Sequence, residues 1–233
     1  NIILPFNDEE EKLYVANLAE ANKELQELYD LEGSDKMQIL KLLTRLRQLC
    51  LEPRLVYDDI DQPSSKLKAC MELIKTMQEN KQKVLLFSSF TSVLDLIAEE
   101  CQKAGITYYM LTGSTNKEDR RELVSRFQKD DTTVFLISLK AGGTGLNLTS
   151  AEAVIHFDPW WNVSAQNQAT DRAYRIGQKN NVQVFNLVMK DSVEEKIIEL
   201  QKRKKELADM FVENNSGGLS QMSKEDILSL FTM

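Results

Sequence analysis

The sequence predicts an α/β fold: a parallel sheet with helices on both of its faces, preceded by an N-terminal helical hairpin and followed by C-terminal helices. Two observations carry this prediction. Through the middle of the chain, short runs rich in β-branched and aromatic residues alternate with helical segments, which is typical of a parallel sheet covered on both faces. At both ends of the chain, apolar residues recur at helical spacing instead.

The first part of the chain, residues 1–63, is predicted to form a helical hairpin and a linker. Apolar residues recur every three or four positions over 7–50, and "EGSD" at 32–35 interrupts the run. The acids of "NDEEE" open a helix and follow no strand, so helix capping explains them better than a magnesium site. Two prolines and clustered acids over 50–65 indicate a connector.

The middle part, residues 64–191, is predicted to hold the sheet. The expected strands are 83–89, 107–113, 132–138, 153–158 and 182–188. The expected helices between them are 92–104, 117–128 and about 164–174, after a first helix that begins at "SKLKACMELIKTMQ". Because crossovers in parallel sheets are right-handed, the loops at the carboxyl ends of the strands share one rim, where ligands of such sheets bind.

The last part, residues 192–233, is predicted to hold a long helix over 192–212 and a small closing helix at "SKEDILSLF", after a glycine-rich break. Ser192 followed by Glu195 is the spacing with which two side chains cap a helix start, and Asn116 followed by Asp119 resembles a helix start too.

Composition excludes several classes of protein. The chain has 233 residues, 42% of them hydrophobic and 28% charged, with a net charge of −7 that argues against a nonspecific polyanion binder with a basic surface overall. No apolar run approaches the roughly 20 residues that span a bilayer. The three cysteines lack metal-site spacing and are expected to be core thiols, and the single histidine, His156, is expected at a strand end.

Three segments could carry chemistry. "QATDRAYRIGQ" sets Arg172 and Arg175 one helical turn apart, as a fork that fits phosphate oxygens or as surface ion pairs with Asp171 or Glu152. "AGGTGLNL", after a strand, lets a backbone pass close to a ligand or simply makes a tight turn, and Lys140 before it is either a phosphate contact or a solvated lysine.

In "DPWWN", adjacent tryptophans point to opposite sides if the backbone is extended, so one is expected to pack inward and the other to reach the rim. A phosphate loop is missing from the sequence: it contains no G-x-x-x-x-G-K-[ST] motif. A nucleotide hydrolase needs such a loop to bind the phosphates of its nucleotide.

Four segments, taken in order, closely resemble the carboxyl-terminal RecA-like lobe of the Swi/Snf-type ATPases in helicase superfamily two. They are "VLLFSSFTSVLDLI", "LTGSTNKEDR", "SLKAGGTGLNLTSAEAVIHFDPWWN" and "QATDRAYRIGQ". The resemblance covers about residues 64–212 and implies a RecA-like lobe, related to the P-loop NTPase fold. The helical start is similar to the family's helical extension, and the terminal helix resembles its brace helix.

In that family a first lobe carries the phosphate loop and the magnesium site. The resemblance therefore implies that ATP and Mg²⁺ are held mainly by a first lobe outside this chain, and that this chain alone binds neither. Arg172 and Arg175 match the family's arginine fingers, Gln168 accompanies them, and Gly143 and Gly145 match the block that lines the nucleotide cleft. The positions that match contacts to DNA phosphates, or the DNA-facing side, are Ser88, Ser89, Gly113, Ser114, Lys140 and Trp161.

Three positions depart from the family's pattern. Val163 stands where the family usually has Pro, Glu52 where it has His, and Asn167 where it has an acid. These departures bear on local loop geometry and on the packing of the extension. They leave both arginines in place.

The resemblance implies the second motor lobe of an ATP-driven double-stranded DNA translocase or remodeller. Its full-length parent would be a DNA-dependent ATPase, and the chain alone would be inactive. The expected partners are double-stranded DNA, the first lobe of the same chain and DNA-bound proteins, without a membrane. The expected location is the cytoplasm with the nucleoid in a prokaryote, or the nucleus in a eukaryote. A non-catalytic interaction or DNA-binding module and an RNA helicase lobe stay open as alternatives.

Overall fold

The computed structural model describes residues 1–30, 36–142, 146–160, 167, 171, 181–211 and 224–232. The chain forms two compact units. The sheet unit holds residues 1–2 and 67–188, and the helical unit holds residues 3–66 and 189–233. The parts of the chain before and after the sheet thus lie together in the helical unit.

Among the described residues, six strands form one sheet, in the order β1-β6-β5-β2-β4-β3. Their bounds are β1 Ile2–Leu4, β2 Val84–Ser88, β3 Tyr108–Leu111, β4 Val134–Ser138, β5 Ala153–His156 and β6 Gln183–Met189. The pairs β2–β4, β2–β5, β3–β4 and β5–β6 are parallel, and the register sets Ser88 beside Ser138 and Phe87 beside His156. The predicted α/β fold with a parallel sheet is therefore confirmed.

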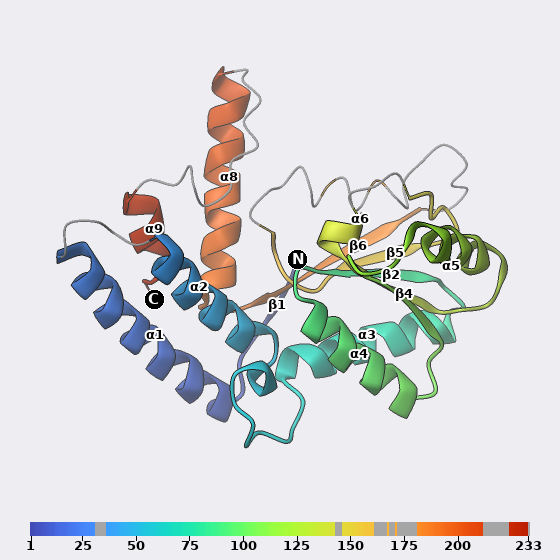
Figure 1. Ribbon diagram of the computed structural model, residues 1–233, viewed down its shortest axis with the longest axis horizontal. Helices are drawn as coiled ribbons and strands as arrows, with labels where there is room; N and C mark the ends of the chain where they lie inside the picture. Colours follow the sequence, from blue (N-terminus) through green and yellow to red (C-terminus); the bar gives the residue numbers. More distant parts are fainter. Residues whose placement is uncertain are drawn as a thin grey trace. The chain divides into compact units, whose positions relative to one another are not determined.

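Helices cover both faces of the sheet (Figure 1). The bounds are α3 Ser65–Glu79, α4 Thr91–Lys103, α5 Lys117–Lys129 and the short α6 Leu139–Gly142. Helices α3 and α4 lie on one face, and α5 lies on the other. The predicted helix at about 164–174 lies almost entirely outside the described residues.

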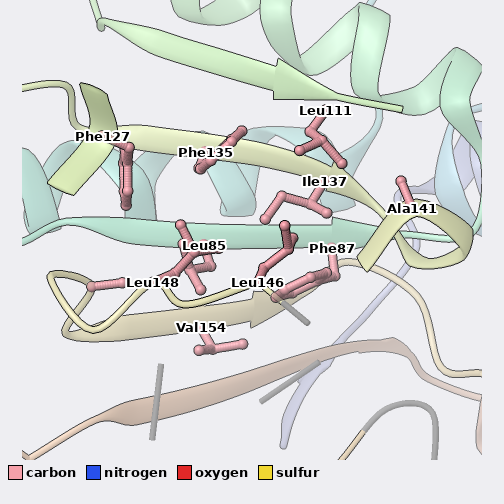
Figure 2. Packing of buried hydrophobic residues seen from close by; sticks show 11 residues of the cluster. Leu85, Phe87, Leu111, Phe127, Phe135, Ile137, Ala141, Leu146, Leu148 and Val154 are labelled. Carbon is pink, nitrogen blue, oxygen red and sulfur yellow. The ribbon is translucent and has the colours of Figure 1, made fainter. Parts of the chain in front are cut away.

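Buried hydrophobic side chains hold α5 against the sheet. Figure 2 shows Leu85 and Phe87 of β2 beside Phe135 and Ile137 of β4, with Phe127 of α5 packed against them. These strand residues are two apart, so they share one face of the sheet. All five are fully buried. This face of the sheet is thus closely packed against α5.

The helical unit contains α1 (Asp8–Asp30), α2 (Lys36–Leu51), the short 3-10 helix η1 (Pro53–Leu55), α8 (Val193–Phe211) and α9 (Lys224–Leu230). The helical hairpin and the C-terminal helices are confirmed, with α1 packed on α2. Asn7 Oδ1 accepts from the amides of Glu9 and Glu10 at 3.0 and 2.9 Å, and Glu10 Oε2 accepts from the Asn7 amide at 3.1 Å. The acids at this helix start therefore serve in capping, as expected.

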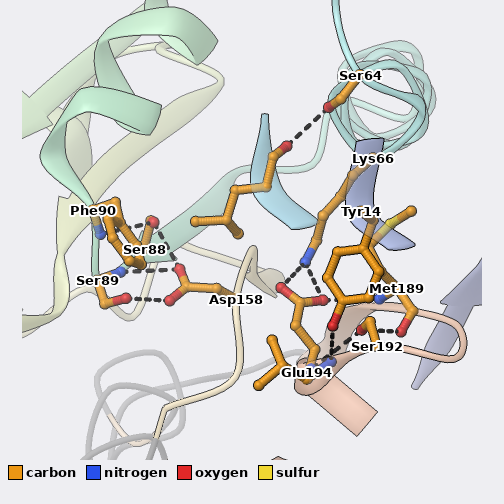
Figure 3. A network of polar contacts seen from close by, with 12 residues as sticks. Tyr14, Ser64, Lys66, Ser88, Ser89, Phe90, Asp158, Met189, Ser192 and Glu194 are labelled. Carbon is orange, nitrogen blue, oxygen red and sulfur yellow. Dashed lines mark hydrogen bonds and ion pairs between the residues drawn. The ribbon is translucent and has the colours of Figure 1, made fainter. Parts of the chain in front are cut away.

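A buried ion pair fixes the start of α8 within the helical unit (Figure 3). Lys66 Nζ lies 2.6 and 2.7 Å from the carboxylate oxygens of Glu194, and the two side chains are 0% and 1% exposed. Glu194 Oε2 also accepts from the Met189 amide at 2.8 Å. The hydroxyl of Tyr14 accepts from the Val193 amide at 2.7 Å. Each partner of the buried charge pair is thus held by hydrogen bonds, as buried charges require.

Two features of the fold differ from the sequence-based expectation. Strand β1 was not predicted, because three residues at a sheet edge give too short a pattern. At the start of α8, Ser192 Oγ accepts from the Glu194 amide at 3.2 Å, while Glu195 Oε2 accepts from the Asp191 amide at 2.7 Å. The capping pair is therefore displaced by one residue from the predicted reciprocal box. No helix in the described ranges is both long and apolar enough to cross a membrane.

Candidate functional site

The carboxyl ends of four adjacent strands, β5, β2, β4 and β3, define the rim that we consider as the functional site. The loops that follow these strands begin at Phe157, Ser89, Leu139 and Thr112. Because the strands are parallel, all four loops leave the sheet at one edge. Three of the loops carry predicted DNA contacts, and the fourth leads toward Trp161.

A carboxylate joins the loops after β2 and β5. Asp158, 1% exposed, accepts from Ser88 Oγ at 2.7 Å and from the Ser89 amide at 3.0 Å, both at Oδ1. The Ser89 hydroxyl donates to Oδ2 of the same carboxylate. Ser88 Oγ in turn accepts from the Phe90 amide at 3.1 Å, where α4 is about to begin (Figure 3). One buried charge thus sets the relative position of two rim loops.

Ser88 is 0% exposed, so its hydroxyl cannot reach a ligand at the rim in this structure. In this structure the Ser88 hydroxyl positions Asp158, and the DNA contact that the resemblance implies for Ser88 stays a prediction. Ser89 is only partly buried, but its hydroxyl and amide also bond to Asp158. Both donors of Ser89 are thus directed at Asp158, and its DNA contact stays a prediction.

The loop after β3 is exposed and held by short-range hydrogen bonds. Thr112 Oγ1 and Ser114 Oγ lie 2.8 Å apart, and the Thr112 amide donates to Thr115 Oγ1 at 3.0 Å. Asn116 Oδ1 accepts from the amides at 118 and 119, at 3.0 and 2.9 Å, which confirms Asn116 as the helix start. Gly113 has no atom near the place that a Cβ would fill. The predicted pair Gly113 and Ser114 is thus open to a ligand.

The loop after β4 begins with α6, which carries Lys140. Ser138 Oγ accepts from the Ala141 amide at 3.4 Å. Arg120 Nη1, from α5, donates to the Ala141 carbonyl at 3.0 Å. The Lys140 side chain is exposed, and no salt bridge joins it to any residue that the structure describes. Lys140 is therefore free to meet an anion at the rim.

His156 takes no part in this rim. It is 1% exposed and stacks on Phe87 with ring centroids 5.7 Å apart. Burial lowers the pKa of His156 to about 4, outweighing the nearby Asp158, which raises it. The imidazole is therefore neutral near pH 7, in keeping with the expected strand-end residue.

The predicted nucleotide-contacting residues lie outside the described residues. These are Gly143, Gly145, Gln168, Arg172 and Arg175, and Trp161 of the DNA-binding set lies outside as well. Within the described ranges no three His, Cys, Asp or Glu side chains are grouped so that they could hold a metal ion. Nothing in the described site therefore specifies how ATP or Mg²⁺ is held.

Sequence reasoning missed two residues that organise the rim, Asp158 and Arg120. Asp158 comes nearly directly after a buried strand, and this position could have marked it as a candidate. Its partners, however, depend on β5 lying beside β2, and the order of the strands in the sheet cannot be deduced from the sequence. Arg120 is one of many charged residues on an amphipathic helix, and its bond to the Ala141 carbonyl leaves no sequence signal.

Glu52, one of the departures from the family's pattern, has a structural explanation. Its side chain is 1% exposed and accepts from Arg54 Nε at 2.9 Å, Arg54 Nη2 at 3.1 Å and the Ser64 amide at 2.9 Å. Glu52 also caps η1. The carboxylate thus fastens the linker to the end of α2, and the packing of the extension is well defined at this position.

Comparison with known proteins places the chain in a family. The family model described as helicase conserved C-terminal domain matches residues 65–177. An uncharacterized ATP-dependent helicase of Mycoplasma pneumoniae is 36% identical over 99% of this chain and 22% of its own length. The ISWI chromatin-remodeling complex ATPase ISW1 of Saccharomyces cerevisiae is 34% identical over 89% of this chain and 20% of its own length. The chain therefore spans about a fifth of these relatives.

Solved structures agree with the sequence relatives. The SWI2/SNF2 ATPase C-terminal domain of Sulfolobus solfataricus has a TM-score of 0.78 and 26% identity, over 99% of this chain and 96% of that domain. The SWI2/SNF2 ATPase core of the same organism, solved in complex with double-stranded DNA, has a TM-score of 0.77 and 29% identity, over 98% of this chain and 49% of that core. With its parallel sheet, its rim and these relatives, the chain belongs to the Swi/Snf-type ATPases of helicase superfamily two, as a carboxyl-terminal RecA-like lobe.

Proposed function

We propose that this chain is the second motor lobe of an ATP-driven double-stranded DNA translocase or remodeller. Its part is to supply two arginine fingers to a nucleotide held by a first lobe, and to grip the DNA backbone with its rim. The full-length protein would be a DNA-dependent ATPase that acts on DNA-bound proteins. It would work with the nucleoid in a prokaryotic cytoplasm, or in a eukaryotic nucleus.

The observation that carries the proposal is the makeup of the rim. Gly113 with open space beside it, the exposed Ser114 and the exposed Lys140 follow adjacent parallel strands, and Ser89 begins the loop after a third strand. Such groups suit the phosphates of a DNA backbone and carry no base-specific readout. The matching half of a relative's core was solved with double-stranded DNA, which supports this choice of ligand.

The division of labour between two lobes follows from what the sequence lacks. The sequence has no phosphate-loop motif, yet it has two arginines three residues apart, Arg172 and Arg175. A guanidinium stays charged at any working pH and matches phosphate oxygens geometrically. ATP bound by the first lobe would supply the hydrolysable phosphoanhydride, and these arginines would stabilise the negative charge that develops on it.

The direct test is turnover by the full-length protein that contains this chain. Arg172→Ala and Arg175→Ala are each expected to lower DNA-stimulated ATP hydrolysis by about 10³- to 10⁵-fold, the worth of an arginine finger. DNA affinity should stay close to that of the wild type. The matched control is Arg126→Ala, because Arg126 is exposed and pairs with Glu122 at 2.5 Å on the surface of α5. This control should keep wild-type turnover.

Two results would count against the proposal. Wild-type turnover in either finger variant would remove that arginine from the catalytic site. Robust ATP hydrolysis by purified residues 1–233 alone would refute the split between two lobes. If the full-length protein bound DNA but showed no DNA-stimulated hydrolysis at all, the non-catalytic DNA-binding module would be the better description.

A further inference from the structure

A basic cleft lies on the α5 side of the sheet unit, next to the loop that follows β3. Its volume is about 620 Å³, and its lining includes Thr115, Lys117, Arg120, Arg121 and Asn147. The lining residues come from the end of the β3 loop, from α5 and from the chain after β4. None of them belongs to the set of DNA contacts that the family resemblance implies.

Three cations of the cleft share one face of α5. Lys117, Arg120 and Arg121 stand at positions i, i+3 and i+4, which are neighbours on a helix surface. The first-turn acids, Glu118 and Asp119, stand at i+1 and i+2, away from this face. The geometry of α5 therefore gathers positive charge on the cleft side.

Two of these cations have no partner among the residues that the structure describes. Lys117 and Arg121 are exposed, and neither makes an ion pair or hydrogen bond with any residue that the structure describes. Two other cations of the sheet unit do have acidic partners: Arg126 pairs with Glu122 at 2.5 Å and Lys103 with Glu100 at 2.7 Å. On a chain with a net charge of −7, an unpaired arginine and lysine on one cleft point to an anionic ligand.

The cleft also adjoins the rim. Arg120 Nη1 bonds to the Ala141 carbonyl at 3.0 Å, which ties α5 to the short helix that carries Lys140. The amino end of α5 follows directly from Gly113 and Ser114. Helix capping by Asn116 already satisfies the first amides, so the cleft's capacity to bind lies in its side chains.

We propose that the α5 cleft binds a phosphate of the DNA backbone through Lys117 and Arg121, extending the DNA track of the rim along α5. This inference rests on the proposed function, because it takes DNA as the ligand of the rim. Arginine offers planar paired donors to phosphate oxygens, and lysine adds a point charge. Arg120 is a positioning residue, since its guanidinium holds the wall of the cleft to Ala141.

The test compares two double charge reversals in the chain itself. Lys117→Glu with Arg121→Glu alters the cleft, and Lys68→Glu with Lys75→Glu makes the same change in net charge on exposed positions of α3. Duplex DNA binding is measured by fluorescence anisotropy from 50 to 200 mM salt. The milder variant Lys117→Gln with Arg121→Gln is measured too. It separates a loss of DNA contacts from a folding defect that the charge-reversal variant could have.

The cleft variants should lose at least about 10-fold in affinity relative to the α3 variant, and their slope of log affinity against log salt should fall by about two. Equal losses in the cleft and α3 variants would show a general charge effect and overturn the site. Unchanged binding by both cleft variants, with a wild type that binds, would overturn the cleft and leave the proposed function standing. If the wild type did not bind duplex DNA at 50 mM salt, both the cleft site and the proposed function would be refuted. Equal binding of polyglutamate would assign the cleft to acidic peptides instead.

Discussion

The buried ion pair of the helical unit yields the sharpest stability prediction. Replacing Lys66 by Met removes the cation but leaves the carboxylate of Glu194 buried at 1% exposure, where it still accepts from the Met189 amide. Breaking a buried pair in this way costs about 3–5 kcal/mol. With a urea m-value of about 2 kcal/mol per M, the unfolding midpoint should fall by about 2 M.

The assay is urea unfolding followed by circular dichroism at 222 nm, which reports on the helices. Lys68→Met is the matched control: it lies on the same helix, is exposed and should change stability by about 0.5 kcal/mol at most. The double variant Lys66→Met with Glu194→Gln should recover stability relative to Lys66→Met alone. This double variant removes the buried negative charge and keeps an acceptor for the Met189 amide. A loss no larger than in Lys68→Met, or no recovery in the double variant, would refute the reasoning.

Two further predictions concern pH and thiol chemistry. Burial lowers the pKa of His156 to about 4, whereas the pKa in the unfolded chain is about 6.5. As the pH falls, the unfolded chain therefore binds the proton first. The contribution of the neutral, buried His156 to the unfolding free energy is fully present above pH 6.5 and is lost as the pH falls toward 4. Between pH 6.5 and 5 the unfolding free energy should fall by about 2 kcal/mol more than in His156→Gln, and NMR should show the imidazole titrating near pH 4; a midpoint near 6.5 would contradict its burial. Cys50, Cys70 and Cys101 are buried, and burial raises the pKa of Cys101 to about 12, so a thiol reagent at pH 8 should label the native chain slowly and all three thiols after unfolding. Rapid labelling of the native chain would count against their core positions.

The fold was accessible from the sequence because its signals are long and periodic. The runs that became β2 and β4 are apolar without interruption, and both are buried along their whole length. Asn116 was recognisable as a helix start because capping depends on neighbours within three residues. Strand β1, with three residues, offered no such signal.

The site was less accessible, because its key contacts join residues that are distant in sequence. The bond between Ser88 and Asp158 spans 70 positions, and it exists only because β5 lies beside β2 in the sheet. The resemblance implies that Ser88 contacts DNA, which stays a prediction; the bond from its hydroxyl to this carboxylate could not be foreseen from the sequence. Lys117 and Arg121 became visible only once the structure showed which helical cations have acidic partners.

The hydrogen bonds that Asp158 makes with Ser88 and Ser89 affect how the rim could bind a DNA backbone. Contacts to successive phosphates stabilise a complex only if their spacing is fixed in advance, since ordering loose loops on binding would cost free energy. Asp158 fixes the β2 and β5 loops to each other through Ser88 and Ser89, and Arg120 fixes α5 to the loop after β4. Each tie is a side chain bonded to a backbone or hydroxyl group of a neighbouring rim element. The rim is therefore expected to move as one body with its sheet, so that a displacement of the lobe would displace every bound phosphate by the same step.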